Sequence, residues 1–442
     1  MKRKIYEKLV KWKEESKGHT AMLIQGAHRV GKTHIAEEFA RENYRSYILI
    51  DFEKADKTVK GLFDDLSDIP LLLQTLSRIE HVTLYERESL MIFDNVQTFP
   101  RARESIKFMV ADGRYDFLET GVLATYWENV KDIIIPSEEE QMTLFPMDFE
   151  EFCWALGDET TVPTIRSHFE TLSPLGDELH KSIMTQFVKY MLVGGMPESV
   201  KEYAETLDFH RCECVKSDIL DSFRQEIASR SRKPDRNKTM ALFDAVPSEL
   251  MKRDRTFVPR HVDPNGRIEK YEGALLWLEE SHICSLCQKA DFTENGPFLH
   301  AKYGKMKCYM GDTGLLITHF IDGDVMDDVY PATLTGDLNV RGGMFTENIV
   351  AQILRSNGHE LLYHTFYTEG NKNLREVDFL IRRGRDVCPI EVRPGRSDLH
   401  ASLDRFIEMH SGNLGQAYIL HSDDVRMDED VALLPVYMAI CL

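Results

Sequence analysis

The chain has 442 residues, of which 43% are hydrophobic, and its formal net charge is −19. This length suits about three domains, and the hydrophobic content supports a sizeable core, which excludes a mainly disordered chain. So acidic a composition argues against a protein that binds nucleic acid over its whole surface. No run of about 18 apolar residues occurs, and no apolar segment follows the basic N-terminus. We therefore expect a cytoplasmic protein with no membrane span and no signal peptide.

The eight cysteines do not suggest a metal site. Cys212 and Cys214 are close in sequence, as are Cys284 and Cys287, and His282 lies near the second pair. A zinc site would need a second pair at matching spacing, which the sequence lacks. We therefore expect reduced thiols, as in a protein of the cytosol.

Residues 26–33 fit the phosphate-binding pattern G-x-x-x-x-G-K-[ST]. Glycines let such a loop curl so that successive backbone N–H groups face phosphate oxygens. We expect Lys32 to place its positive charge on the β- and γ-phosphates of ATP, and the Thr33 hydroxyl to bind Mg²⁺. The predicted nucleotide-binding residues are Gly26, Ala27, His28, Arg29, Val30, Gly31, Lys32 and Thr33.

The segments on either side of this loop support the same prediction. The apolar run 21–24 precedes the loop and predicts a buried strand, and residues 35–40 follow with apolar side chains at helical spacing. The N-terminus of that helix would add a favourable dipole for phosphate. The strand-loop-helix order therefore favours a nucleotide site over a chance glycine-lysine turn.

A second strand prediction ends in the carboxylate of Asp94. Residues 90–93 are apolar, and Asp94 follows them directly. In a phosphate-loop NTPase a carboxylate at this place contacts Mg²⁺, often through water. Ligands collect at the carboxyl edge of an α/β sheet, so we expect Asp94 to lie beside the loop with Thr33 and to act as a second metal ligand.

Asn95 occupies the position where many ATPases of this type carry a glutamate that polarises the attacking water. An amide cannot accept a proton as a carboxylate does. We therefore expect ATP binding with weakened hydrolysis. Glu53, just past the preceding strand at 46–52, is a candidate for a carboxylate supplied from the side, although an exposed loop residue is the favoured interpretation.

Further candidates for the catalytic machinery lie downstream. Residues 115–121 predict another strand, and Thr120 stands where such sheets carry a γ-phosphate sensor, or else a hydrogen bond that closes the strand. Arg101, Arg103 and Arg114 are candidates for a side chain that would reach the nucleotide of a neighbouring subunit in an oligomer.

An ordered set of motifs resembles the prokaryotic AAA-superfamily P-loop ATPases that carry a C-terminal domain of unknown function. The motifs are residues 26–33, 92–97 (IFDNVQ), 119–121 (ETG), 147–152 (MDFEEF), 194–198 (GGMPE), 312–316 (DTGLL), 347–348 (EN) and 376–379 (EVDF). They span nearly the whole chain. The family's usual Asp-Glu is Asp94-Asn95 here, which affects the expected turnover of ATP.

The resemblance implies an α/β fold with several parts. The predicted architecture is a P-loop AAA-type ATPase core with a doubly wound parallel sheet over residues 1–160 and a helical lid over 161–235. A winged-helix domain follows over 236–325, and a C-terminal α/β domain similar to restriction endonucleases over 326–442. At residues 146–148, Asp148 is the predicted N-cap of a helix.

The predicted winged helix could contact either DNA or a protein partner. Arg253, Arg255, Arg260 and Arg267 give it positive charge, but Asp254, Asp263 and Glu269 interrupt that charge. The sequence therefore predicts only a weak basic patch, and both kinds of partner stay open.

The C-terminal domain resembles the core of PD-(D/E)xK nucleases. Glu347 lies near the start of a predicted helix, and Asp378 and Glu391 lie on two consecutive predicted strands. In that chemistry carboxylates hold Mg²⁺ and a lysine helps to activate water. The lysine position is Arg393, which stays charged and cannot act as a base. A degenerate nuclease fold used for binding or regulation is therefore favoured.

These observations lead to one expected function and two alternatives. We expect an ATP-binding AAA-type ATPase with Mg²⁺-dependent but weakened hydrolysis, in which Lys32, Asp94, Asn95 and Thr120 are the catalytic candidates. The first alternative is an ATP-gated DNA endonuclease that cuts at Asp378 and Glu391. The second is a nucleotide-dependent switch that does not hydrolyse ATP.

Overall fold

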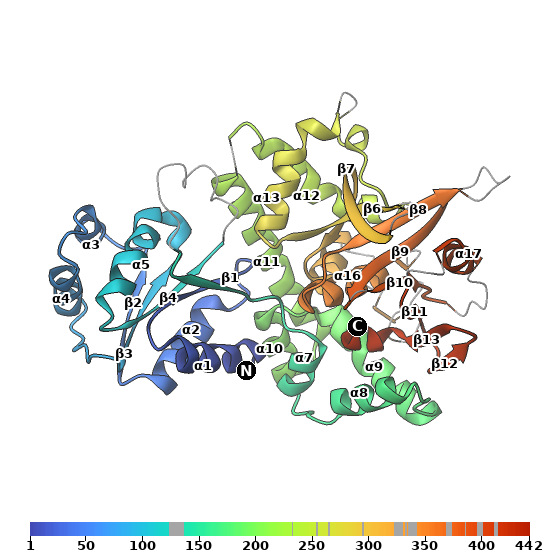
Figure 1. Ribbon diagram of the computed structural model, residues 1–442, viewed down its shortest axis with the longest axis horizontal. Coiled ribbons are helices and arrows are strands. Elements are labelled where there is room, and N and C mark those ends of the chain that lie inside the picture. Colours follow the sequence, from blue (N-terminus) through green and yellow to red (C-terminus); the bar gives the residue numbers. More distant parts are fainter. Residues whose placement is uncertain are drawn as a thin grey trace. The chain divides into compact units, whose positions relative to one another are not determined.

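The computed structural model describes residues 1–122, 137–231, 233–252, 255–263, 266–293, 296–321, 330–331, 334, 343–367, 374–384, 386–395, 401–410 and 414–442. The chain divides into two compact units. The first contains residues 1–145 with 230–232 and 280–282, and the second contains the remainder. Each unit is described by itself (Figure 1).

The first unit alternates helices and strands. Its elements are α1 (Lys4–Ser16), β1 (Ala21–Gln25), α2 (Lys32–Asn43), β2 (Ser46–Asp51), α3 (Lys57–Gly61), η1 (Leu62–Asp64), α4 (Ile69–Ile79), β3 (Ser89–Asp94), η2 (Val96–Thr98), α5 (Pro100–Asp112), β4 (Asp116–Gly121) and β5 (Glu139–Thr143). The predicted strands at 21–24, 46–52, 90–94 and 115–121 are confirmed to within a residue or so.

The five strands of this unit form one parallel sheet in the order β2-β3-β4-β1-β5. Strand β3 is buried throughout, as expected of a parallel strand covered on both faces. Helices α4 and α5 pack against the face that carries Met91 and Phe93, and α2 also packs on the sheet. Because all strands run the same way, Gln25, Asp51, Asp94 and Gly121 end at one edge.

The second unit begins with helices and continues into a sheet. Its elements are α7 (Phe149–Ala155), α8 (Thr161–Thr171), α9 (Asp177–Val193), α10 (Pro197–Thr206), α11 (Phe209–Arg230), α12 (Arg236–Leu250), η4 (Pro259–His261), η5 (Ile268–Lys270), α13 (Glu272–Glu280), β6 (Cys284–Thr293), β7 (Gly296–Met310), α14 (Thr313–Phe320), α16 (Met344–Ser356), β8 (Leu362–Tyr367), β9 (Leu374–Arg383), β10 (Asp386–Val392), α17 (Ala401–His410), β11 (Ala417–His421), β12 (Arg426–Asp428), β13 (Val431–Pro435) and η8 (Val436–Cys441). Asp148 caps α7 in a capping box with Glu151, which confirms the predicted cap.

A single mixed sheet of eight strands runs through this unit, in the order β12-β13-β11-β10-β9-β8-β6-β7. The hairpin β6-β7 belongs to the predicted winged-helix segment, yet β6 pairs in parallel with β8 through Gln288 and Lys289. The hairpin and the C-terminal strands are therefore one layer of structure. The division of this region into separate domains at residue 325 stays a prediction.

Two of the motifs that carry the family resemblance meet in a buried junction. The Asp312 carboxylate accepts hydrogen bonds from the backbone N–H groups of Gly195 (2.6 Å) and Leu315 (2.9 Å). A Cβ on Gly314 would lie 2.5 Å from the Cα of Gly194, so only glycine permits this approach. The motifs at 194–198 and 312–316 therefore hold helices of this unit together.

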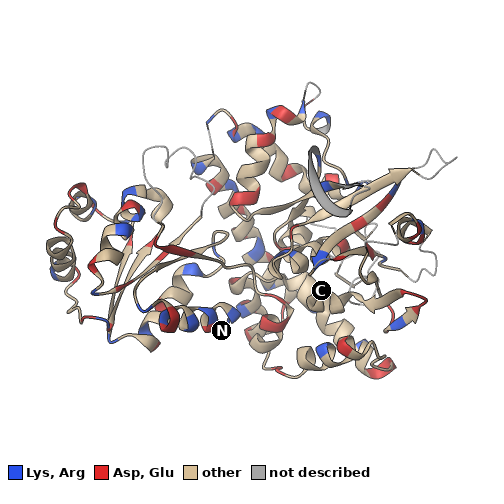
Figure 2. Ribbon diagram, in the orientation of Figure 1, with Lys and Arg blue, Asp and Glu red and all other residues tan. Residues whose placement is uncertain are grey.

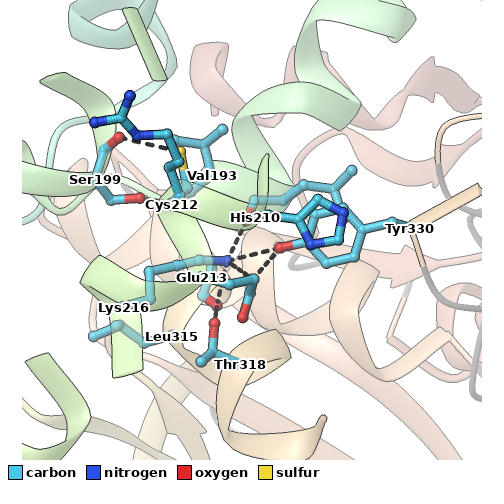
Figure 3. A network of polar contacts seen from close by, with 12 residues as sticks. Val193, Ser199, His210, Cys212, Glu213, Lys216, Leu315, Thr318 and Tyr330 are labelled. Carbon is cyan, nitrogen blue, oxygen red and sulfur yellow. Dashed lines mark hydrogen bonds and ion pairs between the residues drawn. The ribbon is translucent and has the colours of Figure 1, made fainter. Parts of the chain in front are cut away.

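Beside this junction lies a lysine with no exposed side-chain surface. The Lys216 ammonium donates to the Leu192 carbonyl (2.7 Å) and to the Tyr330 hydroxyl (3.0 Å), and it forms an ion pair with Glu213 (Figure 3). Since buried charges need partners, these contacts offset the desolvation of the ammonium. We therefore assign Lys216 a structural role within the second unit.

Two further expectations concern the whole chain. All eight cysteines are free thiols, as expected of reduced cysteines. Across the described part of the chain, no helix combines the length and the apolar character needed to cross a bilayer.

Candidate functional site

The loop between β1 and α2 has the backbone geometry that its glycines allow. Gly31 is the N-cap of α2 and has φ 98°, a conformation that residues with a Cβ rarely adopt. A Cβ on Gly26 would lie 2.3 Å from the Leu144 carbonyl oxygen. Both glycines are therefore required by local sterics, and the loop ends at a helix N-terminus, where anions are favoured.

Lys32 lies over the loop that precedes it. Its Nζ donates to the carbonyl oxygens of Gly26 (2.9 Å) and Ala27 (2.8 Å), and the residue is buried. Within the same loop, burial lowers the pKa of His28 to about 4, with the charge of Lys32 adding to the effect. His28 is therefore neutral near pH 7, and Lys32 is the buried cation of the loop.

Thr33, Asp94 and Thr120 come together at the carboxyl edge of the sheet. The Thr33 hydroxyl lies 2.9 and 3.1 Å from the two carboxylate oxygens of Asp94, and Thr120 donates to the same carboxylate. Burial raises the pKa of Asp94, while the hydrogen bonds from Thr120 and Thr33 act in the opposite direction. A hydroxyl beside a carboxylate is a donor set that fits Mg²⁺, which takes oxygen ligands.

Asn95 bridges two carboxylates. Its side-chain Nδ2 lies 3.0 Å from Asp51 Oδ1 and 3.2 Å from Asp94 Oδ2. Gln97 in turn donates to the Asn95 amide oxygen at 3.3 Å. Asn95 has φ 59°, in the left-handed region that asparagine tolerates better than most residues. The residue predicted to weaken catalysis is therefore fixed by hydrogen bonds on both sides.

Asp51 is the functional candidate that the sequence analysis missed. It ends β2 directly beside Asp94, because the β2-β3 register pairs these two residues. Burial raises its pKa, but hydrogen bonds from Lys54 and Asn95 outweigh burial, so the net pKa is lowered. One signal was present in the sequence, since the apolar run 48–50 is followed directly by Asp51, as the run 90–93 is followed by Asp94.

The structure shows the surroundings of the other catalytic candidates in this unit, which are Glu53 and three arginines. The Glu53 side chain is 53% exposed, as the favoured interpretation expected. The prediction that Arg103 could reach the nucleotide of a neighbouring subunit is wrong. Its side chain is buried and forms an ion pair with Glu139 at 2.6 Å. Arg101 donates to the Phe63 and Asp64 carbonyls, and Arg114 pairs with Asp112.

The structure brings Asp378, Glu391 and Arg393 of the nuclease-like prediction together on two paired strands. The β9-β10 register pairs Ile390 with Phe379, so Glu391 and Asp378 follow opposite each other. Asp378 accepts a hydrogen bond from the Val392 N–H (2.8 Å), and Glu391 pairs with Arg393.

Glu347 instead belongs to a buried ionic cluster that the sequence did not predict. The Lys307 Nζ, with no exposed side-chain surface, lies 3.1 Å from Glu347 and 2.7 Å from Glu376. Arg255 and Tyr309 also contact Glu347. Among the side chains that the structure describes, no group of three or more His, Cys, Asp or Glu could hold a metal ion.

Comparison with protein families assigns three segments. Residues 18–153 match a family described as an AAA domain. Residues 184–323 and 342–438 match two families described as domains of unknown function, DUF8612 and DUF4143. The N-terminal segment is therefore an AAA-type P-loop domain, and a C-terminal domain of unknown function follows it, as the resemblance implied. The nuclease likeness has no support from these matches.

Comparison with solved structures gives only partial superpositions. The Aeropyrum pernix ORC1 protein in complex with DNA is 12% identical, with 76% of this chain and 95% of that chain covered at a TM-score of 0.30. Drosophila ORC bound to DNA is 13% identical, with 72% and 95% covered at 0.27. At these scores neither fold nor function is inferred from them. The comparison with curated proteins found no match.

Proposed function

We propose that the AAA-type domain binds ATP with Mg²⁺ and hydrolyses it slowly. The observation that carries this proposal is the meeting of Lys32, Thr33, Asp94 and Thr120 at the carboxyl edge of the parallel sheet. Loop, helix N-terminus and metal-binding oxygens lie where α/β proteins place nucleotides. The chain is further proposed to act in the cytoplasm.

Each residue of this site has one task in the proposal. The loop N–H groups and Lys32 hold the phosphates, and Lys32 exchanges its carbonyl partners for phosphate oxygens. Thr33 and Asp94 would hold Mg²⁺, and the bound ion would supply charge neutralisation to the phosphates. Thr120 keeps the Asp94 carboxylate oriented. Asn95 fixes the position of neighbouring groups, but it cannot take a proton from water.

The non-hydrolysing switch and the endonuclease have less support. A switch that never hydrolyses ATP is compatible with Asn95, but it would not use the Asp51 carboxylate in catalysis. An endonuclease would need Glu347, Asp378 and Glu391 around one metal ion, but Glu347 pairs with the Lys307 ammonium and Glu391 with the Arg393 guanidinium. A DNA contact at the predicted winged helix has also lost Arg255, which pairs with Glu347.

The test is the binding of Mg²⁺-ATP to the full chain by titration calorimetry. Lys32→Ala removes the buried ammonium that faces the loop, and binding should become undetectable. Lys57→Ala, an exposed lysine on α3, is the matched control and should bind as the wild type does. Circular dichroism checks that both variants are folded. If folded Lys32→Ala binds ATP as tightly as the wild type, the nucleotide site lies elsewhere.

A further inference from the structure

We propose that Asp51 supplies the carboxylate that position 95 lacks, so that the hydrolysis this domain retains depends on Asp51. The inference rests on the proposed ATPase function. Asp51 and Asn95 come from neighbouring strands and share a hydrogen bond of 3.0 Å. In this arrangement the carboxylate stands at the end of β2 and the amide follows β3.

The position of Asp51 is set by strand register. Residues 46–51 of β2 pair in parallel with residues 89–94 of β3, so Asp51 lies beside Asp94. The side chain of Asp51 is 15% exposed. It is therefore close to the proposed metal-binding carboxylate, and part of its carboxylate is accessible to a water molecule.

The contacts of Asp51 leave its carboxylate available. Oδ1 accepts hydrogen bonds from Asn95 and from the Glu53 N–H at 3.0 Å. Oδ2 pairs with Lys54 at 2.7 Å, but the Lys54 side chain is 86% exposed. Because the lysine end of this pair is in solvent, holding the Lys54 side chain in one place costs conformational freedom, and the pair adds little to stability. Lys54 therefore does not hold Asp51 away from a substrate.

Electrostatics explains why the amide and the carboxylate belong together. Glutamate at position 95 would place a third carboxylate beside Asp51 and Asp94, and closely spaced like charges disfavour ionisation. The Asn95 amide instead donates to both existing carboxylates. Positions 51 and 95 therefore suit one carboxylate and one amide, and the carboxylate could stand at either position.

The proposed step is ordinary hydrolysis. A water oxygen bonds to the γ-phosphorus, and the bond from that phosphorus to the β–γ bridging oxygen breaks. ADP leaves with the electron pair of that bond, and the proton of the attacking water passes to the Asp51 carboxylate. Asp51 then returns the proton to solvent, and the products are ADP and inorganic phosphate.

The experiment measures phosphate release and ATP affinity for three variants of the full chain. Asp51→Asn keeps the oxygen that accepts from the Glu53 N–H, so the turn persists while the carboxylate is lost. Its turnover should fall by at least about 10²-fold, the lower end of the roughly 10²–10⁴-fold that general-base catalysis contributes. Asn95→Glu alone should not exceed the wild type, because it crowds three carboxylates together. The exchange Asp51→Asn with Asn95→Glu should restore wild-type turnover or surpass it.

Glu53→Gln tests the competing carboxylate two residues from Asp51, which is 53% exposed and pairs with Arg230 at 2.8 Å, and its turnover should not change. Equal turnover in Asp51→Asn and wild type overturns the inference, as does a loss in Glu53→Gln in its place. ATP binding without any hydrolysis in the wild type also overturns it, but leaves the binding function standing. Loss of ATP binding in the wild type contradicts the proposed function itself.

Discussion

Asp94 accepts hydrogen bonds from several other residues of the proposed nucleotide site. Its carboxylate faces donors from three places in the chain, namely Thr33 after the loop, Thr120 on β4, and Asn95 beside it. Burial disfavours the charged form and raises the pKa of Asp94, while the hydrogen bonds from Thr120 and Thr33 favour the charged form. These hydrogen bonds therefore favour the charged carboxylate that a divalent cation would need.

Thr120 should be tested by removing its hydroxyl alone. Thr120→Val deletes one hydrogen bond to Asp94, and hydrogen bonds to charged groups are worth about 1.5–3 kcal/mol. The Asp94 pKa should rise further and Mg²⁺-ATP affinity should fall about tenfold or more. Calorimetry with and without Mg²⁺ separates the metal from the nucleotide. Thr120→Ser is the control, because it retains the hydroxyl, and equal affinity for Thr120→Val would show that Thr120 has no role in holding Asp94.

Residues whose role follows from local pattern could be predicted from the sequence. The loop at 26–33 follows one strand that the sequence predicts and Asp94 ends another, because strand, turn and carboxylate are contiguous there, and their roles toward ATP and Mg²⁺ stay predictions. Asp51 could not be recognised in the same way. Its apolar run is visible, but its closeness to Asn95 depends on the register of β2 against β3, which no local pattern specifies.

Pairing between strands that are distant in the chain likewise could not be predicted from the sequence. The sequence predicts strands at 375–381 and 387–393, and the structure has β9 and β10 at these places, with bounds that differ by one or two residues. The parallel pairing of β6 with β8 joins segments far apart in the chain, and nothing in either segment encodes it. The cluster of Lys307, Glu347 and Glu376 depends on this sheet, because it joins β7, α16 and β9.

Lys307 should therefore be a strong stability determinant of the second unit. Lys307→Met keeps the volume but leaves Glu347 and Glu376 without that cation in a buried site. Breaking a buried pair by removing one partner typically costs about 3–5 kcal/mol. Urea unfolding followed by hydrogen exchange of β7, α16 and β9 would measure the loss.

Lys305→Met is the matched control, since Lys305 lies on the same strand and is exposed. Surface substitutions of this kind usually change stability by less than about 0.5 kcal/mol. Adding Glu347→Gln and Glu376→Gln to Lys307→Met should recover part of the lost stability. If Lys307→Met and Lys305→Met are equally stable, the ammonium does not compensate the buried carboxylates.

For the whole molecule, charge decides which macromolecules it would attract. The net charge is −19, and Lys and Arg are scattered among Asp and Glu along the ribbon instead of forming one stripe (Figure 2). Long-range steering therefore opposes the approach of DNA. The basic patch predicted for the winged helix is weaker still, since Arg255 is engaged with Glu347. Arg253 and Asp254 of that patch lie outside the described residues.

The full chain should accordingly leave DNA intact. Supercoiled plasmid incubated with the protein, ATP, and Mg²⁺ or Mn²⁺ should show no nicking above the buffer control. Arg393 stays charged and cannot help to activate water as a nuclease lysine does. Asp378 accepts a hydrogen bond from the Val392 N–H, and Glu391 pairs with Arg393. Nicking that disappears in Asp378→Asn and in Glu391→Gln would contradict this prediction and establish a nuclease. Nicking that persists in both variants would come from a contaminating enzyme, because a metal-dependent centre in this domain could not lose those carboxylates and keep its activity.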